Sequence, residues 1–493
     1  MKKPLLDRKI LAILMLASFF FSSCENWLDI APEKDLIKDN FWKKTEDANS
    51  ALAAVYGSLR DVSLENIIWG ECRADIAINM PGDYSPISGS DINPENNAVN
   101  WSKYYRTINL ANTLLYYSKD VLANDMSFTQ EMKDGIDAEA LFLRSLSYFY
   151  LVRMWKEVPL ILNPSISDTC NLYYAKSTEA VVVKQIISDL LIAKDKAFTT
   201  EFLNDPAYFK GRANQYSIMT LLADVYLWNQ QYEKCIEYCD YVISSGLYGL
   251  QPKDTWFEIY NPCNSVEGIF ELQCIDDGTT NQVNPIYTGN STTGYASLIN
   301  LGNGQASFQL GPKYTALFPD KSDKRYCNGK TSTWKYVGLN YDENLRRSNV
   351  SERDANVIYY RYADILLMKA EALNELGRVA EAQNYVTQTA ERAGMLPVTG
   401  ITDQTEMRSI IMDERAKEFA LEGKRWFDLL RKAKMNGFQN KKELGDLLVN
   451  LADAKSQALL KSKVNDTMMY YLPVPYDELK RNKNLKQNPF YER

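Results

Sequence analysis

Apolar side chains recur three and four positions apart along most of this chain, which is the spacing of one face of an α-helix. The clearest segment is AEALFLRSLSYFYLVRMW at 138–155, where apolar side chains fill so many positions that burial on most sides is expected. This helix is expected to end at Val158-Pro159, because proline cannot continue it. Strand-like alternation is rare, so the predicted fold class is mainly α. Further helices are predicted near residues 46–60, 100–118, 179–198, 212–228, 231–245, 357–377, 379–394, 405–422, 424–434 and 441–460.

Two helix pairs joined by short turns form an internal repeat with a shift of 147 residues. The segment LLADVYLWNQQYEKCIEYCDYV (221–242) aligns with MKAEALNELGRVAEAQNYVTQT (368–389), so that Ala223 matches Ala370. Small residues at such positions let two antiparallel helices approach closely, which is the packing of a tetratricopeptide repeat. The pattern therefore predicts a superhelix of helical hairpins, which serves as a scaffold or as a surface for a partner protein.

Two regions interrupt the helical pattern. Residues 76–99 and 246–350 are rich in Gly, Pro, Asn, Ser and Thr, with aromatic residues at intervals. Loops of this length inside a compact helical body usually carry function or small structure of their own. We therefore expect a helical scaffold at 40–75, 100–245 and 357–493, and ligand-binding insertions in the two interruptions.

The amino-terminal segment has the pattern of an export signal. A basic start is followed by the apolar stretch Ile10–Phe21, which is too short to span a bilayer comfortably. Ser22 and Ser23 then precede Cys24, and this junction resembles a bacterial lipobox, in which the cysteine takes a diacylglycerol. Residues 1–23 are thus predicted to be a signal peptide and Cys24 a lipid anchor. The alternative is a plain secreted protein with an incidental cysteine.

The charge and composition exclude several kinds of site. The formal net charge is −7, and loss of residues 1–23, with four basic side chains and one acidic, leaves −10. Such a field repels nucleic acid. The chain has no histidine, so Ser-His-Asp, Cys-His and histidine-based zinc sites are excluded. Paired carboxylates, as in glycoside hydrolysis, stay possible.

The eight cysteines are scattered and include no CxxC pair, so a disulfide-stapled scaffold is not predicted. Cys235 and Cys239 lie four residues apart and share a helix face. They are expected to be small packing residues, with half of a metal site as the alternative. No metal or cofactor is expected.

The segment DERAKEF (413–419), with Glu422 and Arg425, interleaves acids and bases three and four residues apart. This is the spacing of intrahelical ion pairs. Nearby cations lower the pKa of a carboxyl group, whereas a general acid needs a raised pKa. We therefore interpret this segment as structural and not as an active site.

Recognisable motifs follow one another from end to end of the chain: WLDIAP (27–32), FWKKTEDANSALAAVYGSL (41–59), VNWSKYYRTINLANTLL (99–115), AEALFLRSLSYFYLVRMWKEVPL (138–160), GRANQYSIMTLLADVYLW (211–228), YYRYADILLMKAEALNELG (359–377), IIMDERAKEFALEGKRWFDLLR (410–431) and YLPVPYDELKRNKNLKQNPFYE (471–492). Through these motifs the chain as a whole resembles the SusD/RagB family, whose members are nutrient-binding surface lipoproteins of Bacteroidota-type Gram-negative bacteria. Two departures are visible: Lys156-Glu157 stands where the family's helix ends in a glycine, and NPFYE replaces the commoner NPGY.

The resemblance implies a single body at 24–493, in which about four tetratricopeptide-like units support a loop-rich ligand-binding face. It also implies a lipid-anchored, surface-exposed protein of the outer membrane that binds glycans without catalysis. The implied partner is a SusC-type TonB-dependent transporter, which the lipoprotein caps and supplies with oligosaccharides. The enzyme that cuts the glycan is normally a separate chain.

Proteins bind sugars by stacking aromatic rings on the apolar ring faces and by aiming polar side chains at the hydroxyl groups. Trp334 and Tyr295 are the predicted stacking platforms, with help from Tyr287 and Tyr84. For each of these rings the alternative is packing on the scaffold. The candidate polar partners are Asp83, Asp277, Asn281 and Arg325, together with Arg73 and Asp75, for which a structural ion pair is the alternative.

Two other functions stay open at this point. One is an enzyme that acts on glycosides through two loop carboxylates. The other is a tetratricopeptide adaptor whose cargo is a peptide, a metal carrier or another nutrient.

Overall fold

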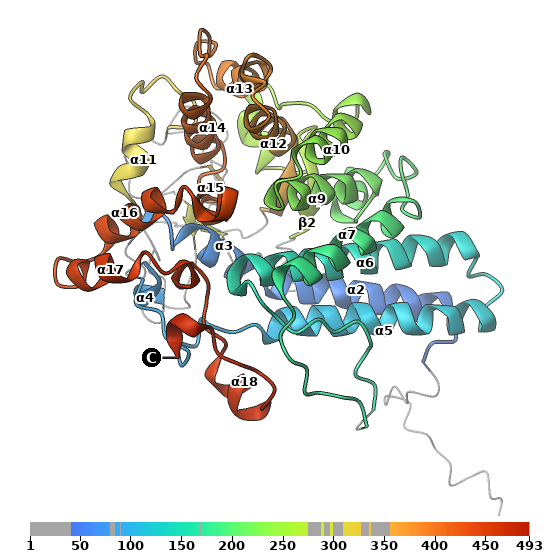
Figure 1. The fold of residues 1–493 in the computed structure, drawn as a ribbon. Coiled ribbons are helices and arrows are strands. Elements are labelled where there is room, and N and C mark those ends of the chain that lie inside the picture. The colour runs from blue at the N-terminus through green and yellow to red at the C-terminus, as the bar shows by residue number, and fades with distance from the viewer. Residues whose placement is uncertain are drawn as a thin grey trace, which may run out of the picture.

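The computed structural model describes residues 41–78, 84–88, 90–167, 169–274, 287–289, 296–298, 309–326, 335–336 and 355–492. Helices dominate this part of the chain, so the prediction of a mainly α fold is confirmed (Figure 1). The longer helices are α2 (Thr45–Asp61), α3 (Ser63–Glu71), α5 (Ser102–Asn124), α6 (Gln130–Trp155), α7 (Glu179–Lys194), α9 (Gln215–Trp228), α10 (Tyr232–Ser244), α12 (Tyr362–Glu375), α13 (Val379–Arg392), α14 (Gln404–Glu418), α15 (Arg425–Phe438) and α16 (Lys441–Leu451).

Helices that follow one another in the chain pack side by side. Helices α2, α5 and α6 contact one another, α7 contacts α6 and α9, and α10, α12, α13 and α14 continue the stack (Figure 1). Shorter helices lie at the edges: α4 (Ser85–Ser88), α8 (Pro206–Gly211), α11 (Pro312–Leu317), α17 (Gln457–Lys463) and α18 (Tyr476–Arg481). The repeated packing agrees with helical hairpins; their tetratricopeptide character stays a prediction.

Helix α6 is buried along most of its length, as its sequence predicts. It begins at Thr129, whose hydroxyl accepts a hydrogen bond from the Met132 amide. It ends at Lys156, which has φ +67° and ψ −57°, and the Glu157 amide donates to the Trp155 carbonyl at 2.8 Å. This is a γ-turn with a positive φ, a conformation that glycine adopts with less strain. The family's glycine is thus replaced at a position where the backbone favours glycine.

Strands are short and pair two by two. β2 (Gly268–Leu272) pairs antiparallel with β6 (Val357–Arg361), and β3 (Tyr287–Gly289) with β4 (Ala296–Leu298). The prediction of a helix from residue 357 is therefore wrong for its first five residues. The first four residues of this strand, VIYY, are β-branched or aromatic and fit a buried pleated surface better than a helix.

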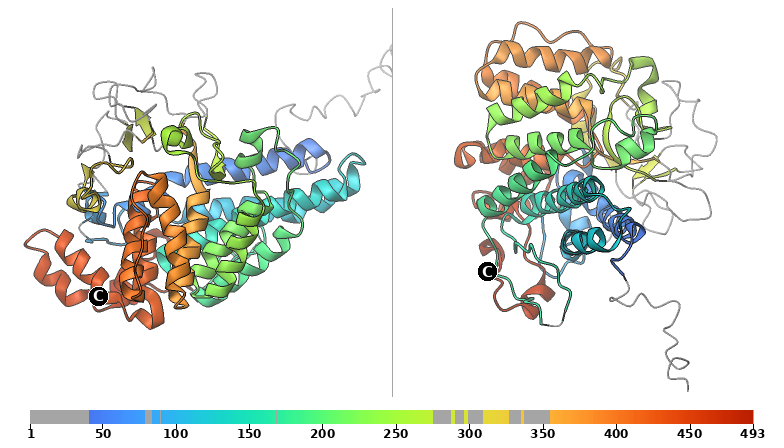
Figure 2. Two further views of the ribbon diagram at one scale, coloured as in Figure 1. Left: turned by 90° about the horizontal axis from the view of Figure 1, so that it is seen from above. Right: turned by 90° about the vertical axis from the view of Figure 1, so that its right-hand side faces the viewer.

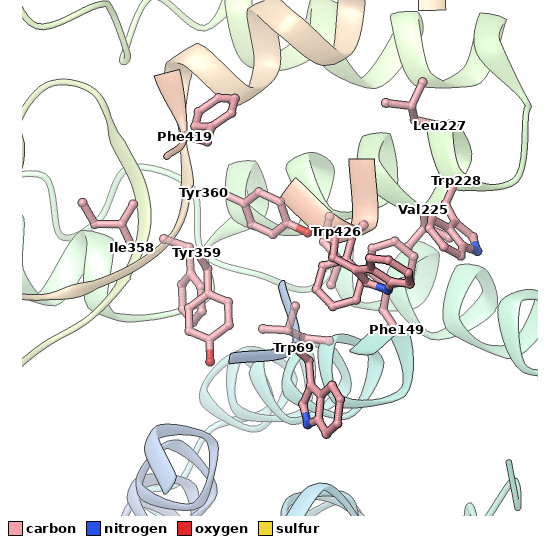
Figure 3. Packing of buried hydrophobic residues seen from close by; sticks show 14 of the residues in the cluster. Trp69, Phe149, Val225, Leu227, Trp228, Ile358, Tyr359, Tyr360, Phe419 and Trp426 are labelled. Carbon is pink, nitrogen blue, oxygen red and sulfur yellow. The ribbon is translucent and has the colours of Figure 1, made fainter. Parts of the chain in front are cut away.

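One continuous hydrophobic core joins the helices. Figure 3 shows Trp69, Phe149, Trp228, Tyr359 and Trp426, which come from α3, α6, α9, β6 and α15 and all belong to this core. Segments from both ends of the chain thus share one core, which agrees with a single body.

Candidate functional site

The two predicted insertions meet in the structure. β1 (Ala77–Ile78), in the first insertion, pairs antiparallel with β5 (Gln309–Leu310) in the second. The Gly311 amide also donates to the Ile76 carbonyl at 2.7 Å, and a Cβ at Gly311 would lie only 2.9 Å from the Asp75 carbonyl oxygen. The two backbone segments can approach this closely because glycine at position 311 has no side chain. Segments more than two hundred residues apart in sequence therefore form one loop-rich face.

The loop-rich face lies on one side of the helical stack. In both views of Figure 2, the strands of the second insertion and helix α2 lie on the same side of the molecule, away from α13 and α14. Tyr84 belongs to this face and is half-buried against the core. Tyr287 lies in β3, on the same insertion as β5. The other stacking and polar candidates, Trp334, Tyr295, Asp83, Asp277 and Asn281, lie outside the described residues and stay predictions.

Arg325 is not placed to bind a ligand. Its side chain is 2% exposed, and the guanidinium pairs with Asp323 at 2.8 Å, Glu414 at 2.7 Å and Glu418 at 3.0 Å. These carboxylates hold the pKa of Arg325 well above its usual range against the opposing effect of burial. The prediction that Arg325 binds the ligand is therefore wrong. Arg325 instead connects the second insertion to helix α14.

Arg73 also binds within the fold. It donates to the carbonyl oxygens of Tyr470 and Met469, both at 2.8 Å, and its guanidinium lies 4.2 Å from the ring centre of Trp426. Burial lowers the pKa of Arg73 to about 10. Its side chain connects the base of the first insertion to the C-terminal part of the chain, so it too leaves the candidate site.

Asp75 forms a buried ion pair, but with Arg425 and not with Arg73. The two carboxylate oxygens accept from Arg425 at 2.8 and 3.0 Å. Burial alone raises the pKa of Asp75, yet the hydrogen bonds and charge of Arg425 outweigh it and leave the pKa below its ordinary value. This bidentate pair fixes the first insertion to α15, so Asp75 is a structural residue as well.

The charged segment at 413–419 is the centre of a buried ion-pair cluster. Glu418 pairs with Arg361, Arg392 and Arg325, and Glu422 pairs with Arg361 and Lys335. The predicted intrahelical pairing is wrong, because these partners come from β6, α13 and the second insertion. The cluster stabilises contacts between elements and not one helix.

The expected low pKa values are present in this cluster. Burial would raise the pKa of Glu422, but the charges of Arg361 and Lys335 lower it to about 2. In the same way Arg392 and Arg361 outweigh burial and hold the pKa of Glu418 well below its usual range. Both groups are ionised and inaccessible, so neither serves as a general acid.

Glu71 differs from these carboxyl groups, because burial raises its pKa to about 8. One carboxyl oxygen accepts from the backbone amides of Gly423 and Lys424, at 2.8 and 3.1 Å. The residue is fully buried under the start of α15. No solvent or substrate reaches it, so its raised pKa reflects structure and not catalysis.

Cys235 and Cys239 are both buried in helix α10. Within the described ranges, no group of three or more Cys, Asp or Glu side chains is arranged to hold a metal ion. In the same part of the chain, no helix combines the length and the apolar character that crossing a bilayer requires.

Two open cavities have lining residues that suit a polar ligand. The α5–α18 cavity has about 550 Å³, and the α2–α8 cavity has about 580 Å³. The first lies between α5, the segment after α6, and α18, and includes Trp101, Tyr105, Tyr173, Glu478 and Arg481. The second lies beside the second insertion, which contributes its residues Leu272 and Gln273. None of the predicted ligand-binding residues that the structure describes lines either cavity.

Comparisons with known proteins agree with this architecture. A family model described as "SusD family" matches residues 227–491, and one described as "Starch-binding associating with outer membrane" matches residues 26–227. SusD-like protein P38 of Formosa agariphila is 26% identical over 467 residues, which cover 85% of this chain and 90% of that protein.

Solved structures share the fold. A SusD superfamily protein from Bacteroides vulgatus matches with a TM-score of 0.73 and 20% identity, over 91% of this chain and 100% of the other. A laminarin binding SusD-like protein matches with a TM-score of 0.69 and 23% identity, over 91% and 99% of the two chains. The two family models together span residues 26–491, and the chain therefore belongs to the SusD family, whose proteins bind carbohydrate, are not enzymes and associate with the outer membrane.

Proposed function

We propose that this protein captures oligosaccharides on its loop-rich face while a lipid on Cys24 tethers it to the outer surface of the cell. It then passes them to a SusC-type TonB-dependent transporter. The observation that carries the proposal is the pairing of β1 with β5, which brings the two aromatic-rich insertions onto one face. A composite face of this kind can present several rings and polar groups to one extended ligand.

The ligand class of the proposal, a glycan, is supported by the descriptions of related proteins. One matching family is described as starch-binding, and a structural relative binds laminarin. On this chain, Trp334 and Tyr295 are the proposed stacking rings, with Tyr287 and Tyr84 beside them. Stacking and hydrogen bonding explain how a glycan is held without being cut.

The stacking proposal is tested by calorimetry with a panel of soluble oligosaccharides. Trp334→Ala and Tyr295→Ala should each lower the affinity for the bound glycan at least about tenfold, which is about 1.4 kcal/mol. Tyr241→Ala is a matched control, because this tyrosine is exposed on the scaffold helix α10 and belongs to neither insertion. Unchanged binding by both loop variants would remove these rings from the site.

The enzymatic alternative predicts new reducing ends when the protein is incubated with the same glycans. Binding without cleavage supports the proposal. The buried, ionised state of Glu418 and Glu422 already argues against acid–base catalysis in the charged segment. An adaptor for peptides or metal carriers would instead give a ligand screen without any sugar.

The tether and the transporter are tested separately. Radiolabelled palmitate should enter the wild-type protein but not the Cys24→Ala variant. A tagged wild-type protein should copurify with a TonB-dependent barrel from detergent-solubilised outer membranes. Absence of label, or absence of a barrel, would overturn the corresponding part of the proposal.

A further inference from the structure

The α2–α8 cavity has one long wall formed by a single face of helix α2. Asn49, Ala53, Gly57 and Arg60 lie along this wall at helical spacing. From the first to the last of these residues the helix rises about 16 Å, at about 1.5 Å per residue. Tyr208 and Arg212 form the opposite wall. With about 580 Å³, the cavity has the size of a small-ligand site.

The middle of this wall is kept open by a glycine. A Cβ built on Gly57 would meet no atom within 4 Å, so the space beside it is unfilled. Glycine inside a helix costs about 1 kcal/mol relative to alanine. The neighbouring Ala53 is equally small. Helix α2 therefore has a residue of low helix propensity at the point where its surface borders the cavity.

The positive charge of Arg60, at one end of the cavity, has no counter-ion among the described residues. Among the described residues, no carboxylate forms an ion pair with Arg60, and no Asp or Glu lines the cavity. The adjacent Asp61 pairs with Arg106 instead. On the far wall Arg212 is neutralised by the buried Glu139, and its guanidinium lies 4.6 Å from the ring centre of Tyr208. One uncompensated guanidinium thus faces a hollow in a chain whose net charge is negative.

The cavity adjoins the loop-rich face, because Leu272 and Gln273 of the second insertion close one end. A glycan held on that face can continue into the cavity. Arginine presents planar, paired donors that match a carboxylate or a sulfate. The side-chain amide of Asn49, toward the other end of α2, also lines the cavity and suits a neutral hydroxyl group.

We propose that the α2–α8 cavity is a binding subsite for an acidic sugar unit, whose anionic substituent pairs with Arg60. This inference rests on the proposed glycan-binding function and narrows its substrate class to glycans that carry carboxylate or sulfate groups. Neutral parts of the same glycan bind on the loop-rich face.

The test is calorimetry with three probes: galacturonate oligosaccharides, the same oligosaccharides after carboxyl reduction, and sulfated oligosaccharides from heparin. Wild-type protein should bind one acidic probe at least about tenfold more tightly than the carboxyl-reduced probe. The affinity should fall when NaCl is raised from 50 to 500 mM, because salt screens the ion pair. The acidic probe that binds distinguishes a carboxylate from a sulfate.

Variants locate the binding. Arg60→Ala should remove the preference for the acidic probe and leave binding of the neutral probe unchanged. Gly57→Leu should fill the hollow and have the same effect, while its melting temperature stays at or above that of the wild type. Arg106→Ala is the control, because it removes a neighbouring surface arginine that already has a carboxylate partner.

The outcomes separate this inference from the proposed function. Binding of neutral glycans with no preference for either acidic probe overturns the subsite and leaves the proposed function standing. An acidic preference that survives in both Arg60→Ala and Gly57→Leu also overturns the subsite. Failure to bind any glycan overturns both.

Discussion

The buried cluster around helix α14 and the α2–α8 cavity both contain arginines. The arginines of the cluster are paired with carboxylates, whereas Arg60 in the cavity has no carboxylate partner among the described residues. In the cluster, Arg361 and Arg392 are held by the carboxylates of Glu267 and Glu418. In the cavity, Arg60 faces open space without a carboxylate among the described residues. A charge that is compensated inside the fold fastens elements together. A charge left uncompensated in a hollow is available to a ligand.

This difference decides which charged residues of the sequence belong to function. Arg325, Arg73 and Asp75 have the residue types of a sugar site, but their partners lie within the protein. The sequence pattern does not distinguish Arg60 from other surface arginines. Only the three-dimensional surroundings of a side chain show whether it has a structural role or is available to a ligand.

The largest effect is expected from breaking the cluster. Glu418→Gln keeps the shape of the side chain but leaves Arg361, Arg392 and Arg325 short of one negative charge. Removing one partner of a buried ion pair costs about 3 to 5 kcal/mol, so the free energy of unfolding should fall by at least about 3 kcal/mol. Urea denaturation measures this. Glu443→Gln, which removes an exposed partner of Lys432, should change it by less than about 0.5 kcal/mol. Equal effects of the two variants would contradict the comparison.

Acid should weaken the cluster through Glu422. Its pKa is about 2 in the folded protein, against an ordinary value of 4.5. The unfolded chain therefore binds a proton more readily, and this contribution to stability is present above about pH 4.5 and lost as the pH falls toward 2. The full effect is about 3.5 kcal/mol, at about 1.4 kcal/mol per pKa unit, and about 2.4 kcal/mol of it should be lost between pH 5 and pH 2.5. Denaturation at pH 5 and pH 2.5 measures it. Glu422→Gln should show a smaller loss over the same range, and an identical loss would contradict the assignment.

Glu71 should give the opposite dependence on pH. Its pKa of about 8 lies above the ordinary value of 4.5, so the folded protein holds a proton that the unfolded chain releases. This stabilisation is complete below about pH 4.5 and decreases as the pH rises toward 8. Glu71→Gln cannot ionise, so its stability relative to the wild type should increase by about 2 kcal/mol between pH 5.5 and 7.5. Thermal melts of both proteins at the two pH values would reveal a constant difference if the assignment were wrong.

The smallest effect on the fold is expected at Arg60. Arg60→Ala should change the free energy of unfolding by less than about 0.5 kcal/mol, because it breaks no ion pair within the described part of the chain. Its affinity for the acidic oligosaccharide should nevertheless fall about tenfold, which is about 1.4 kcal/mol. A loss of stability comparable to that of Glu418→Gln would mean that Arg60 has a structural partner after all.

Much of the fold follows from local pattern. The apolar spacing at 138–155 predicts a buried helix, and α6 covers this segment. Residues 357–361 show the limit of this reasoning, because a short apolar run forms a strand only when a partner such as β2 is present. The two insertions are visible from their composition, but their pairing through β1 and β5 depends on contacts between distant segments.

The candidate site is harder to predict from the sequence, because it also depends on contacts between distant segments. The spacing of 413–419 suggests pairs within one helix, whereas Glu418 finds Arg361 at a separation of 57 residues. The α2–α8 cavity had one signal in the sequence, which is the glycine at position 57 in the middle of a helical pattern. This glycine can be recognised as part of a cavity wall only in the folded protein, where Tyr208 and Arg212 line the same cavity.

The most direct test of glycan binding by this protein is a crystal structure with a bound oligosaccharide. We expect sugar density on the loop-rich face between the insertions at 76–99 and 246–350, with an intact glycosidic chain and aromatic rings against the sugar faces. Sugar density confined to the helical hairpins, or a cleaved product on the loop-rich face, would contradict it.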